Sequence, residues 1–218
     1  MFDDIVDRYD LLSDVLSMGF DRSWRRRTAA ALAAPEGSWV LDAGCGTGAL
    51  GRRLAGRYRV VGVDVSAEML GAARRRVGST MRLLQGSVFH LPFADGVFGG
   101  LVSAFVLRNL EDLQVAFTEL ARVVRPGGKL SIVDITEPRG RAWRRTFDAY
   151  FAVAAPLVGR FSKNPDVYRY LARSLPQLPL PERVSAMLEE AGFGDVRDRS
   201  LAPGMVTLWT ARRMENSG

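Results

Sequence analysis

The sequence has few of the residues that build zinc sites or disulfides, and it has no apolar run long enough for a membrane span. It contains one Cys and one His, whereas a zinc site usually needs three or four nitrogen or sulfur ligands. A single Cys excludes a disulfide within the chain and is typical of a reducing compartment. The longest stretch of low charge, residues 149–159, is too short to span a bilayer and contains Pro156. We therefore expect no metal, no disulfide and no membrane-spanning helix.

Lysine is also scarce, and the chain does not open as a secretory leader would. Only Lys129 and Lys163 are present, so the net charge of +6 comes from arginine. The arginines cluster at residues 25–27 and 74–76, where a solvated helix face explains them as well as an anionic partner does. The first residues, MFDDIVDRYD, are acidic and polar. We expect a cytoplasmic protein with no nucleic-acid partner, in peripheral contact with the inner face of the membrane and assembled as a homodimer.

From residue 36 the chain alternates between short apolar strands and helices. Strands are expected at residues 39–41, 59–63, 81–84, 97–105 and 129–135, with helices at 50–57, 68–76 and 115–124 between them. This alternation predicts a parallel sheet covered on both faces. A helix at 182–190 is followed by strands at 194–200 and 205–212, joined by a tight turn at 202–204, which predicts an antiparallel pair.

Helical segments precede and interrupt this pattern. Residues 3–34 read as helical up to Pro35, and residues 139–175 are helical and rich in aromatic side chains. The expected parts are an N-terminal helical lid segment (1–35), a ligand-binding core (36–138), a helical insertion over the acceptor site (139–180) and a C-terminal helix with two strands that complete the core (181–218). The fold class is therefore α/β: a doubly wound, mostly parallel seven-stranded sheet with an antiparallel C-terminal strand and a helical lid.

The segment VLDAGCGTG, residues 40–48, is the most informative part of the sequence. It places Gly44, Gly46 and Gly48 directly after a strand and before a helix, where glycine allows a sharp turn and the close approach of a ligand. The next strand ends at Asp64, 22 residues beyond Asp42. A carboxylate there accepts hydrogen bonds from both ribose hydroxyls of a nucleoside. The pattern predicts a nucleoside-containing ligand.

A dinucleotide-binding fold is the alternative for this segment. Its motif is G-x-G-x-x-G, whereas the spacing here is G-x-G-x-G with Ala49 following. Asp42 argues against a dinucleotide, because an acid at the end of the first strand repels a pyrophosphate and stabilises an ammonium group. After the third strand, Ser87 and Val88 are expected to lie beside an adenine edge.

The ordered set VLDAGCGTG, VVGVD, QGSVFHLPF, LVSAF and RVVRPGGKL resembles the class I S-adenosylmethionine-dependent methyltransferases over residues 36–212. The resemblance implies a Rossmann-like fold, S-adenosylmethionine as cofactor and S-adenosylhomocysteine as product. Together with the residues above, the expected cofactor contacts are Asp42, Gly44, Gly46, Thr47, Gly48, Asp64, Val65, Met69, Ser87, Val88 and Ala104.

Three further segments narrow the resemblance. The opening MFDDIVDRYDLLSDVLSMGFDRSWRRR, then FVLRNLEDLQVAFTELARVVRPGG, then NPDVYRYLARSLPQLP are similar to the quinone C-methyltransferases of menaquinone and ubiquinone biosynthesis. This similarity implies methyl transfer to a ring carbon of demethylmenaquinol or a related polyprenylated quinol. It also places Arg108 and Asn109 beside the acceptor. Arg108 would stabilise a phenolate oxyanion and Asn109 would orient a water or hydroxyl; a surface ion pair of Arg108 with Glu111 or Asp112 is the alternative.

Aromatic side chains of the two helical segments and of the fourth strand are the candidates for binding an apolar acceptor. They are Tyr9, Phe20, Phe105, Tyr150 and Tyr168, of which Tyr9 and Tyr168 are lid candidates; core packing is the alternative for some of them. His90 is a weaker candidate for a general base. Ala104 and Val106 stand where the resembled family has Ser and Gly, which keeps open a second hypothesis, that the acceptor is another small phenolic or secondary metabolite.

Overall fold

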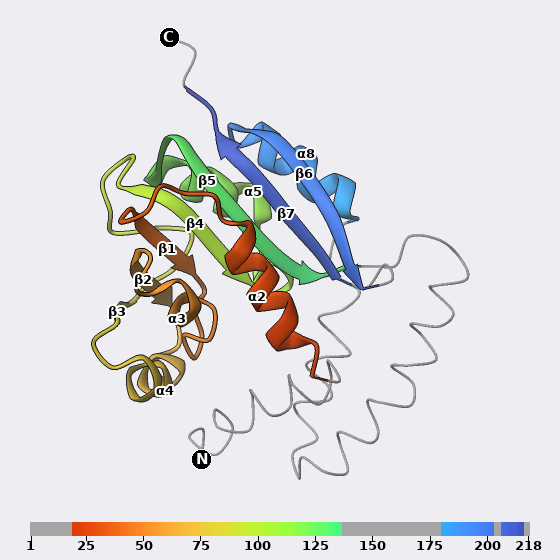
Figure 1. Ribbon diagram of the computed structural model, residues 1–218. Coiled ribbons are helices and arrows are strands. Elements are labelled where there is room, and N and C mark those ends of the chain that lie inside the picture. Colours follow the sequence, from red (N-terminus) through yellow and green to blue (C-terminus); the bar gives the residue numbers. More distant parts are fainter. Residues whose placement is uncertain (1–18, 137–179, 203–205, 216–218) are drawn as a thin grey trace.

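Seven strands form one sheet in the order β3-β2-β1-β4-β5-β7-β6. The computed structural model describes residues 19–136, 180–202 and 206–215. The strands are β1 (Trp39–Ala43), β2 (Arg59–Asp64), β3 (Met81–Gln85), β4 (Phe98–Ala104), β5 (Val124–Ile135), β6 (Phe193–Ala202) and β7 (Val206–Arg213). The neighbours from β3 to β5 pair in parallel, and β7 runs antiparallel to both β5 and β6 (Figure 1). The predicted mostly parallel sheet with an antiparallel C-terminal strand is confirmed.

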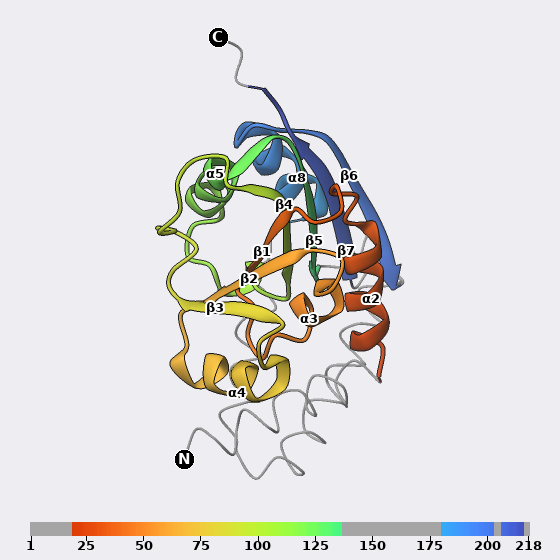
Figure 2. The same cartoon turned by 60° about the vertical axis from the view of Figure 1, so that its left-hand side comes forward.

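Helices cover both faces of this sheet. They are α2 (Asp21–Ala31), α3 (Gly51–Leu54), α4 (Ala67–Val77), the 3-10 turn η1 (Leu107–Asn109), α5 (Leu113–Val123) and α8 (Pro181–Glu190). In Figure 1, α2 crosses in front of the sheet while α5 and α8 lie behind it. Figure 2 shows α2 on one side of the sheet and α5 on the other. The sheet is therefore doubly wound, as predicted.

Side chains that alternate along the strands pack into two separate hydrophobic clusters, one on each face of the sheet. Leu41 of β1 packs with Phe117 and Trp209 against α5 and α8, whereas its neighbour Val40 packs with Trp24 on the side of α2 and α3. Every residue of β4 is buried, which fits a central strand covered on both faces. This continuous apolar burial fixes the strands and therefore the positions at which they end.

Three predicted boundaries were wrong. The described helix α2 begins only at Asp21 and ends at Ala31, so residues 32–34 are not helical. The helix expected at 50–57 is a single turn, because the chain turns to an extended conformation at Ala55. The fifth strand begins at Val124 rather than Lys129, and Pro126 lies inside it next to a register shift between Phe98 and Gly100. Proline interrupts the hydrogen bonds of a strand, and a bulge is where a sheet tolerates it.

The predicted lid segments lie largely outside the described residues. Of the N-terminal part, the structure describes residues 19–35, and of the insertion at 139–180 it describes only residue 180. The division into four parts stays a prediction. Within the described residues, α2 packs on β4, β5 and α3. None of the described helices has the length and apolar character needed to cross a membrane.

Candidate active site

The carboxyl ends of the parallel strands meet at one edge of the sheet, where the site is built. The strand order reverses between β1 and β4, so the loops after these two strands leave toward opposite faces. Open α/β sheets bind ligands in the crevice at such a switch point. The loop after β1 contains the glycines, β2 ends at Asp64, and β4 ends at Ala104. The topology therefore brings these sequence-predicted residues to one edge.

The three glycines of the turn differ in the space around their Cα atoms. A Cβ on Gly46 would meet no heavy atom within 4 Å, whereas one on Gly44 would lie 2.5 Å from Val106 Cγ2 and one on Gly48 would lie 2.8 Å from Val77 Cγ1. Gly46 and Gly48 have φ angles of +52° and +75°, which L side chains rarely adopt. The loop thus packs on the chain at Gly44 and Gly48 and leaves a free approach at Gly46.

Asp64 links the end of β2 to this turn. Its Oδ2 accepts a hydrogen bond from the backbone N–H of Gly46 at 2.8 Å, and its Oδ1 accepts one from the N–H of Ser66 at 3.0 Å. A carboxylate has about four lone-pair positions. Asp64 therefore orients the glycine turn and keeps acceptor capacity for hydroxyl groups of a ligand.

Asp42 is buried beneath the turn, with 1% of its surface exposed. Its Oδ2 accepts a hydrogen bond from the N–H of Gly51 at the start of α3, at 2.9 Å. Burial raises the pKa of this carboxyl to about 7, against the opposing charge of Arg25 and the hydrogen bond from Gly51. Asp42 therefore anchors the loop to the first turn of α3, and its charge depends on pH near neutrality.

The other residues expected around the cofactor occupy the surrounding loops. Thr47 is buried, and its Oγ1 accepts a hydrogen bond from Arg76 Nη1 of α4 at 2.6 Å. Val65, directly after Asp64, is 66% exposed. The backbone N–H of Met69 donates to Ser66 Oγ at 3.1 Å, which caps α4. Val65 therefore presents an apolar surface in front of a well-anchored helix start.

The loop after β3 carries Ser87 and Val88. Val88 is buried in the cluster on the α5 side, and Ser87 Oγ accepts from the N–H of Phe89 at 3.2 Å. The side-chain amide of Gln85 donates to the carbonyl of Val65 at 3.1 Å and so ties this loop to the one after β2. His90 is exposed on the same loop. The structure thus brings Val65 and the Ser87 loop together at the edge.

Ala104 is buried at the end of β4, and the next residue, Phe105, has a left-handed backbone with φ of +64°. A non-glycine residue in this conformation costs on the order of 1–3 kcal/mol and is often found at functional sites. The conformation is held because the N–H of Phe105 donates to the carbonyl of Val133 at 2.9 Å. Phe105 is thereby aimed at α2.

An aromatic row connects α2 to this strained residue. The rings of Phe20 and Trp24 are stacked at 6.1 Å, and the rings of Trp24 and Phe105 are also 6.1 Å apart. The guanidinium of Arg25 lies over the Phe105 ring at 5.1 Å. Phe20 and Phe105 were both predicted to contact the acceptor, whereas Trp24, which joins them, was missed. Its four-residue spacing from Phe20 on a helix was the available signal.

Arg108 forms a buried ion pair. Its Nη1 donates to Asp134 Oδ1 at 3.0 Å, and its exposed fraction is 8%. Asp134 Oδ2 also accepts from the N–H of Leu107 at 2.7 Å, so one carboxylate holds both the backbone and the side chain of the 3-10 turn. Burial raises the pKa of Asp134, and Arg108 opposes that shift. The partner of Arg108 is thus Asp134 of β5, and not Glu111 or Asp112 as the alternative reading had it.

Sequence reasoning missed Asp134, although an acid within the apolar run SIVDI was a visible signal. Asn109 follows Arg108 and is exposed, with its N–H donating to the carbonyl of Val106 at 2.9 Å. The remaining predicted acceptor residues, Tyr9, Tyr150 and Tyr168, lie outside the described residues.

The chemistry available at this edge is binding and charge stabilisation. Burial, together with the charges of Asp42 and Asp64, raises the pKa of the Cys45 thiol, so it is not a ready nucleophile. Among the described residues, no group of His, Cys, Asp and Glu side chains could hold a metal ion. A glycine turn, two strand-end acids and a buried arginine remain.

Comparison with known proteins identifies the family. Residues 1–213 match the model of the ubiE/COQ5 methyltransferase family. The chain belongs to this family. It is therefore an enzyme, a methyltransferase that depends on S-adenosylmethionine.

Relatives of similar length agree with this assignment. A protein of Beutenbergia cavernae named demethylmenaquinone methyltransferase is 39% identical over 216 residues, 98% of this chain and 90% of its own length. One of the same name from Mycolicibacterium vanbaalenii is 39% identical and covers 98% of this chain and 93% of itself. Among solved structures, the YcgJ protein of Bacillus subtilis has a TM-score of 0.67 at 16% identity, covering 89% of this chain and 99% of that one. A SAM-dependent methyltransferase of Aquifex aeolicus has a TM-score of 0.60 at 20% identity, covering 87% and 89%.

Three observations test whether the site of this methyltransferase fits its cofactor. The space over Gly46 is open to a ligand, and the neighbouring Asp64 keeps acceptor positions for ribose hydroxyls. Val65, exposed next to Asp64, offers an apolar face for an adenine ring. An open space, unused acceptor positions and an exposed apolar side chain, which could hold an adenosyl group, therefore lie at one edge of the sheet.

Proposed function

We propose that this methyltransferase transfers a methyl group to a ring carbon of a polyprenylated quinol such as demethylmenaquinol. The observation that carries the proposal is the full-length similarity to proteins named demethylmenaquinone methyltransferase, at 39% identity over 98% of the chain. The match includes the N-terminal residues and the segment between β5 and α8, where we expect the acceptor to be bound. The second hypothesis, another small phenolic or secondary metabolite, is not favoured by these relatives.

The cofactor contacts are part of this proposal. Asp42 and the glycine turn would hold the aminocarboxypropyl side of S-adenosylmethionine, together with Thr47. Asp64 would bind the ribose hydroxyls, while the adenine would lie between Val65, Met69 and the loop of Ser87 and Val88. The backbone of Gly44, Gly46 and Gly48 and the end of β4 at Ala104 would complete the cofactor contacts. After transfer the same residues would hold S-adenosylhomocysteine.

Arg108 is the proposed catalytic residue on the acceptor side. When bound, S-adenosylmethionine supplies a methyl group on a sulfonium whose sulfur departs with the bonding electron pair. A quinol carbon becomes nucleophilic when its hydroxyl loses a proton, and the guanidinium of Arg108 would stabilise the resulting phenolate. Asp134 would aim that guanidinium through the 3.0 Å ion pair. Asn109 would orient a water or hydroxyl that accepts the proton.

Alignment of the acceptor carbon with the methyl group is the larger contribution. Well-oriented reacting pairs gain roughly 7–11 kcal/mol over free encounter. Phe20 and Phe105, joined through Trp24, would line the apolar part of the acceptor chamber. Tyr9, Tyr150 and Tyr168 would complete it, with Tyr9 and Tyr168 closing over it as a lid. The enzyme would take its lipid acceptor at the inner membrane face, as a peripheral protein and a homodimer.

The direct test is incubation of the full chain with methyl-labelled cofactor and chemically reduced demethylmenaquinol. We expect label on a ring carbon, located by mass spectrometry of the extracted quinone. A short phenolic acceptor without a prenyl tail should receive at least tenfold less. If the short phenol is methylated faster than demethylmenaquinol, the proposed acceptor is wrong.

Substitution of Arg108 tests its role against a merely structural one. Arg108→Lys keeps a positive charge but loses the fork geometry that a guanidinium offers to an oxyanion. We expect kcat to fall by 10²–10³ in Arg108→Ala, the order found for removal of an oxyanion-stabilising donor, with cofactor affinity little changed. An unchanged kcat in a folded Arg108→Ala protein would remove Arg108 from the mechanism.

A further inference from the structure

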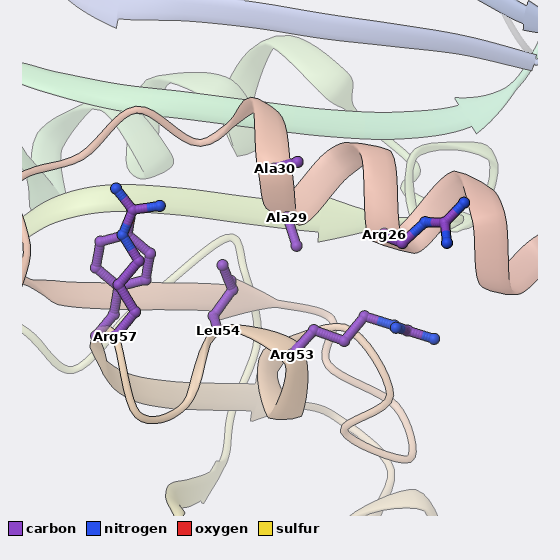
Figure 3. Close-up of a pocket in the computed structure, with 7 residues that line it drawn as sticks. Arg26, Ala29, Ala30, Arg53, Leu54 and Arg57 are labelled. Atoms are coloured by element: carbon purple, nitrogen blue, oxygen red, sulfur yellow. The ribbon is translucent and has the colours of Figure 1, made fainter.

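A cavity of about 280 Å³ lies between α2 and α3, and no residue of the glycine turn is among its lining residues (Figure 3). We call it the α2–α3 groove. Its lining residues are Arg26, Ala29, Ala30, Arg53, Leu54, Arg57 and Tyr58. None of these residues has a part in the proposed binding of the cofactor or the acceptor.

The middle of the groove is apolar and firmly built. Ala29, Leu54 and Tyr58 contribute apolar groups to its lining, and Leu54 and Tyr58 are buried. The Tyr58 hydroxyl lies 3.1 Å from the carbonyl oxygen of Leu32 and 3.2 Å from that of Ala34, to either of which it can donate its proton. These contacts join the chain after α2 to the start of β2. They therefore hold the Tyr58 side chain in the wall of the groove.

Three arginines surround this apolar middle. In Figure 3 the side chains of Arg26 and Arg53 extend in the same direction from α2 and α3, and Arg57 stands at the other end. The guanidinium of Arg57 lies over the ring of Tyr58 at 5.3 Å, which holds it in place. All three side chains are exposed, and none of the described residues that line the groove is acidic.

These arginines differ from others on the same fold. Arg25, on the same helix, is paired with Asp21 at 2.8 Å, and Arg122 of α5 is paired with both Asp95 and Glu119. Among the residues that the structure describes, Arg26, Arg53 and Arg57 have no hydrogen bond to a carboxylate. Three uncompensated positive charges around one cavity attract an anion, and guanidinium groups bind phosphate with two hydrogen bonds each.

We infer that the α2–α3 groove binds the headgroup phosphate of an anionic phospholipid and docks the enzyme on the membrane surface. The apolar middle would receive the glycerol and the first acyl carbons, while the arginines pair with the phosphate. The apolar middle favours a lipid over a nucleic acid, because the phosphate backbone that supplies most nucleic-acid affinity has no apolar part to place there. The inference rests on the proposed function in one respect, since a polyprenylated acceptor resides in a bilayer.

Binding to vesicles tests the inference directly. Full-length protein is sedimented with phosphatidylcholine vesicles that contain or lack phosphatidylglycerol. The test variant is Arg26→Gln/Arg53→Gln/Arg57→Gln. The matched control, Arg75→Gln/Arg197→Gln/Arg199→Gln, removes the same charge from exposed positions of α4 and β6. Circular dichroism verifies that both variants are folded.

A basic residue at an anionic membrane surface contributes roughly a fivefold increase in binding. We therefore expect the groove variant to lose on the order of 100-fold in binding to anionic vesicles, and the control to lose less than tenfold. Equal losses in the two variants would show that net charge alone is responsible and would overturn the groove as a site. Unchanged vesicle binding in the groove variant would overturn it as well. RNA binding of the same proteins is measured in parallel, and a loss confined to RNA binding would likewise overturn it.

Turnover separates this inference from the proposed function. Methylation of a water-soluble demethylmenaquinol analogue with a short tail should be equal in the parent and the groove variant. Methylation of the long-tailed quinol in anionic vesicles should fall in parallel with vesicle binding. If no quinol is methylated by any of the proteins, the proposed function fails while the vesicle-binding result still decides the groove.

Discussion

Replacing Gly46 and Gly48 separately by Ala distinguishes the ligand side of the glycine turn from its packed side. Both residues have left-handed backbones, with φ of +52° and +75°, so each substitution carries a strain of about 1–2 kcal/mol. They differ in their surroundings. The new methyl group meets nothing within 4 Å at Gly46, whereas at Gly48 it lies 2.8 Å from a methyl of the buried Val77.

These distances set different expectations for the two variants. A carbon–carbon contact is favourable at about 3.5–4.0 Å, and forcing an extra methyl into a packed core costs roughly 1–3 kcal/mol. Gly48→Ala should therefore lose about 2–5 kcal/mol of unfolding free energy, and Gly46→Ala only about 1–2 kcal/mol. Conversely, Gly46→Ala places its methyl where the cofactor is expected, so its Kd for S-adenosylmethionine should rise at least tenfold, or about 1.4 kcal/mol.

Urea unfolding measures the first quantity and titration calorimetry with S-adenosylmethionine or S-adenosylhomocysteine measures the second. We expect Gly48→Ala to lose more stability than Gly46→Ala, and Gly46→Ala to lose more cofactor affinity than Gly48→Ala. If Gly46→Ala binds the cofactor as tightly as the parent protein, the open space over Gly46 is not where the cofactor lies. Equal losses of stability would instead show that Val77 yields without cost.

Three further predictions follow from buried or capping groups. The pKa of Asp42 is raised to about 7 from an ordinary 3.8, so the folded state binds this proton more tightly than the unfolded state does. The contribution of this proton to stability is therefore complete below about pH 4, and the free energy of unfolding falls by up to about 4 kcal/mol as the pH rises through 7. Urea midpoints should show this fall in the parent protein and not in Asp42→Asn. Asp134→Asn removes the carboxylate that pairs with the buried Arg108. We therefore expect the free energy of unfolding, measured in urea, to fall by about 3–5 kcal/mol, and kcat to fall with little change in KM for the cofactor. Ser66→Ala removes the cap of α4 and should cost about 1 kcal/mol, as Asp112→Ala should at α5.

Each of these three has an outcome that contradicts it. A pH profile of Asp42→Asn that parallels the parent would assign the pH dependence to other groups, Asp134 first. An Asp134→Asn protein that keeps its kcat would leave the ion pair with a structural role only. If Ser66→Ala destabilises the protein far more than Asp112→Ala does, then Ser66 contributes to stability beyond its cap of α4.

The elements near the site were predictable because their signals are local. The run of apolar residues before the glycines gave β1 and the turn. Phe20 and Phe105 were chosen as apolar candidates in the N-terminal helical segment and at the end of the fourth strand. The start of the fifth strand was predicted wrongly, because the bulge near Pro126 depends on pairing with β4.

Partners distant in the chain could not be read from it. Asp134 and Arg108 are 26 residues apart, and Trp24 contacts Phe105 across 81 residues of sequence; both contacts arise because β4 and β5 pair in parallel and α2 packs on them. The left-handed backbone of Phe105 is likewise imposed by its hydrogen bond to Val133, not by the preference of phenylalanine.

The amino-acid order by itself determined the parallel sheet, the glycine turn and the acid that faces it, because alternating apolar segments and glycine spacing act over a few residues. Only the tertiary structure decided which charges are neutralised. Arg25, Arg108 and Arg122 acquire carboxylate partners from helix spacing or sheet pairing, whereas Arg26, Arg53 and Arg57 meet around an apolar cavity with no acid among the lining residues that the structure describes. Charge in a sequence is additive, but its compensation depends on which surfaces the fold brings together.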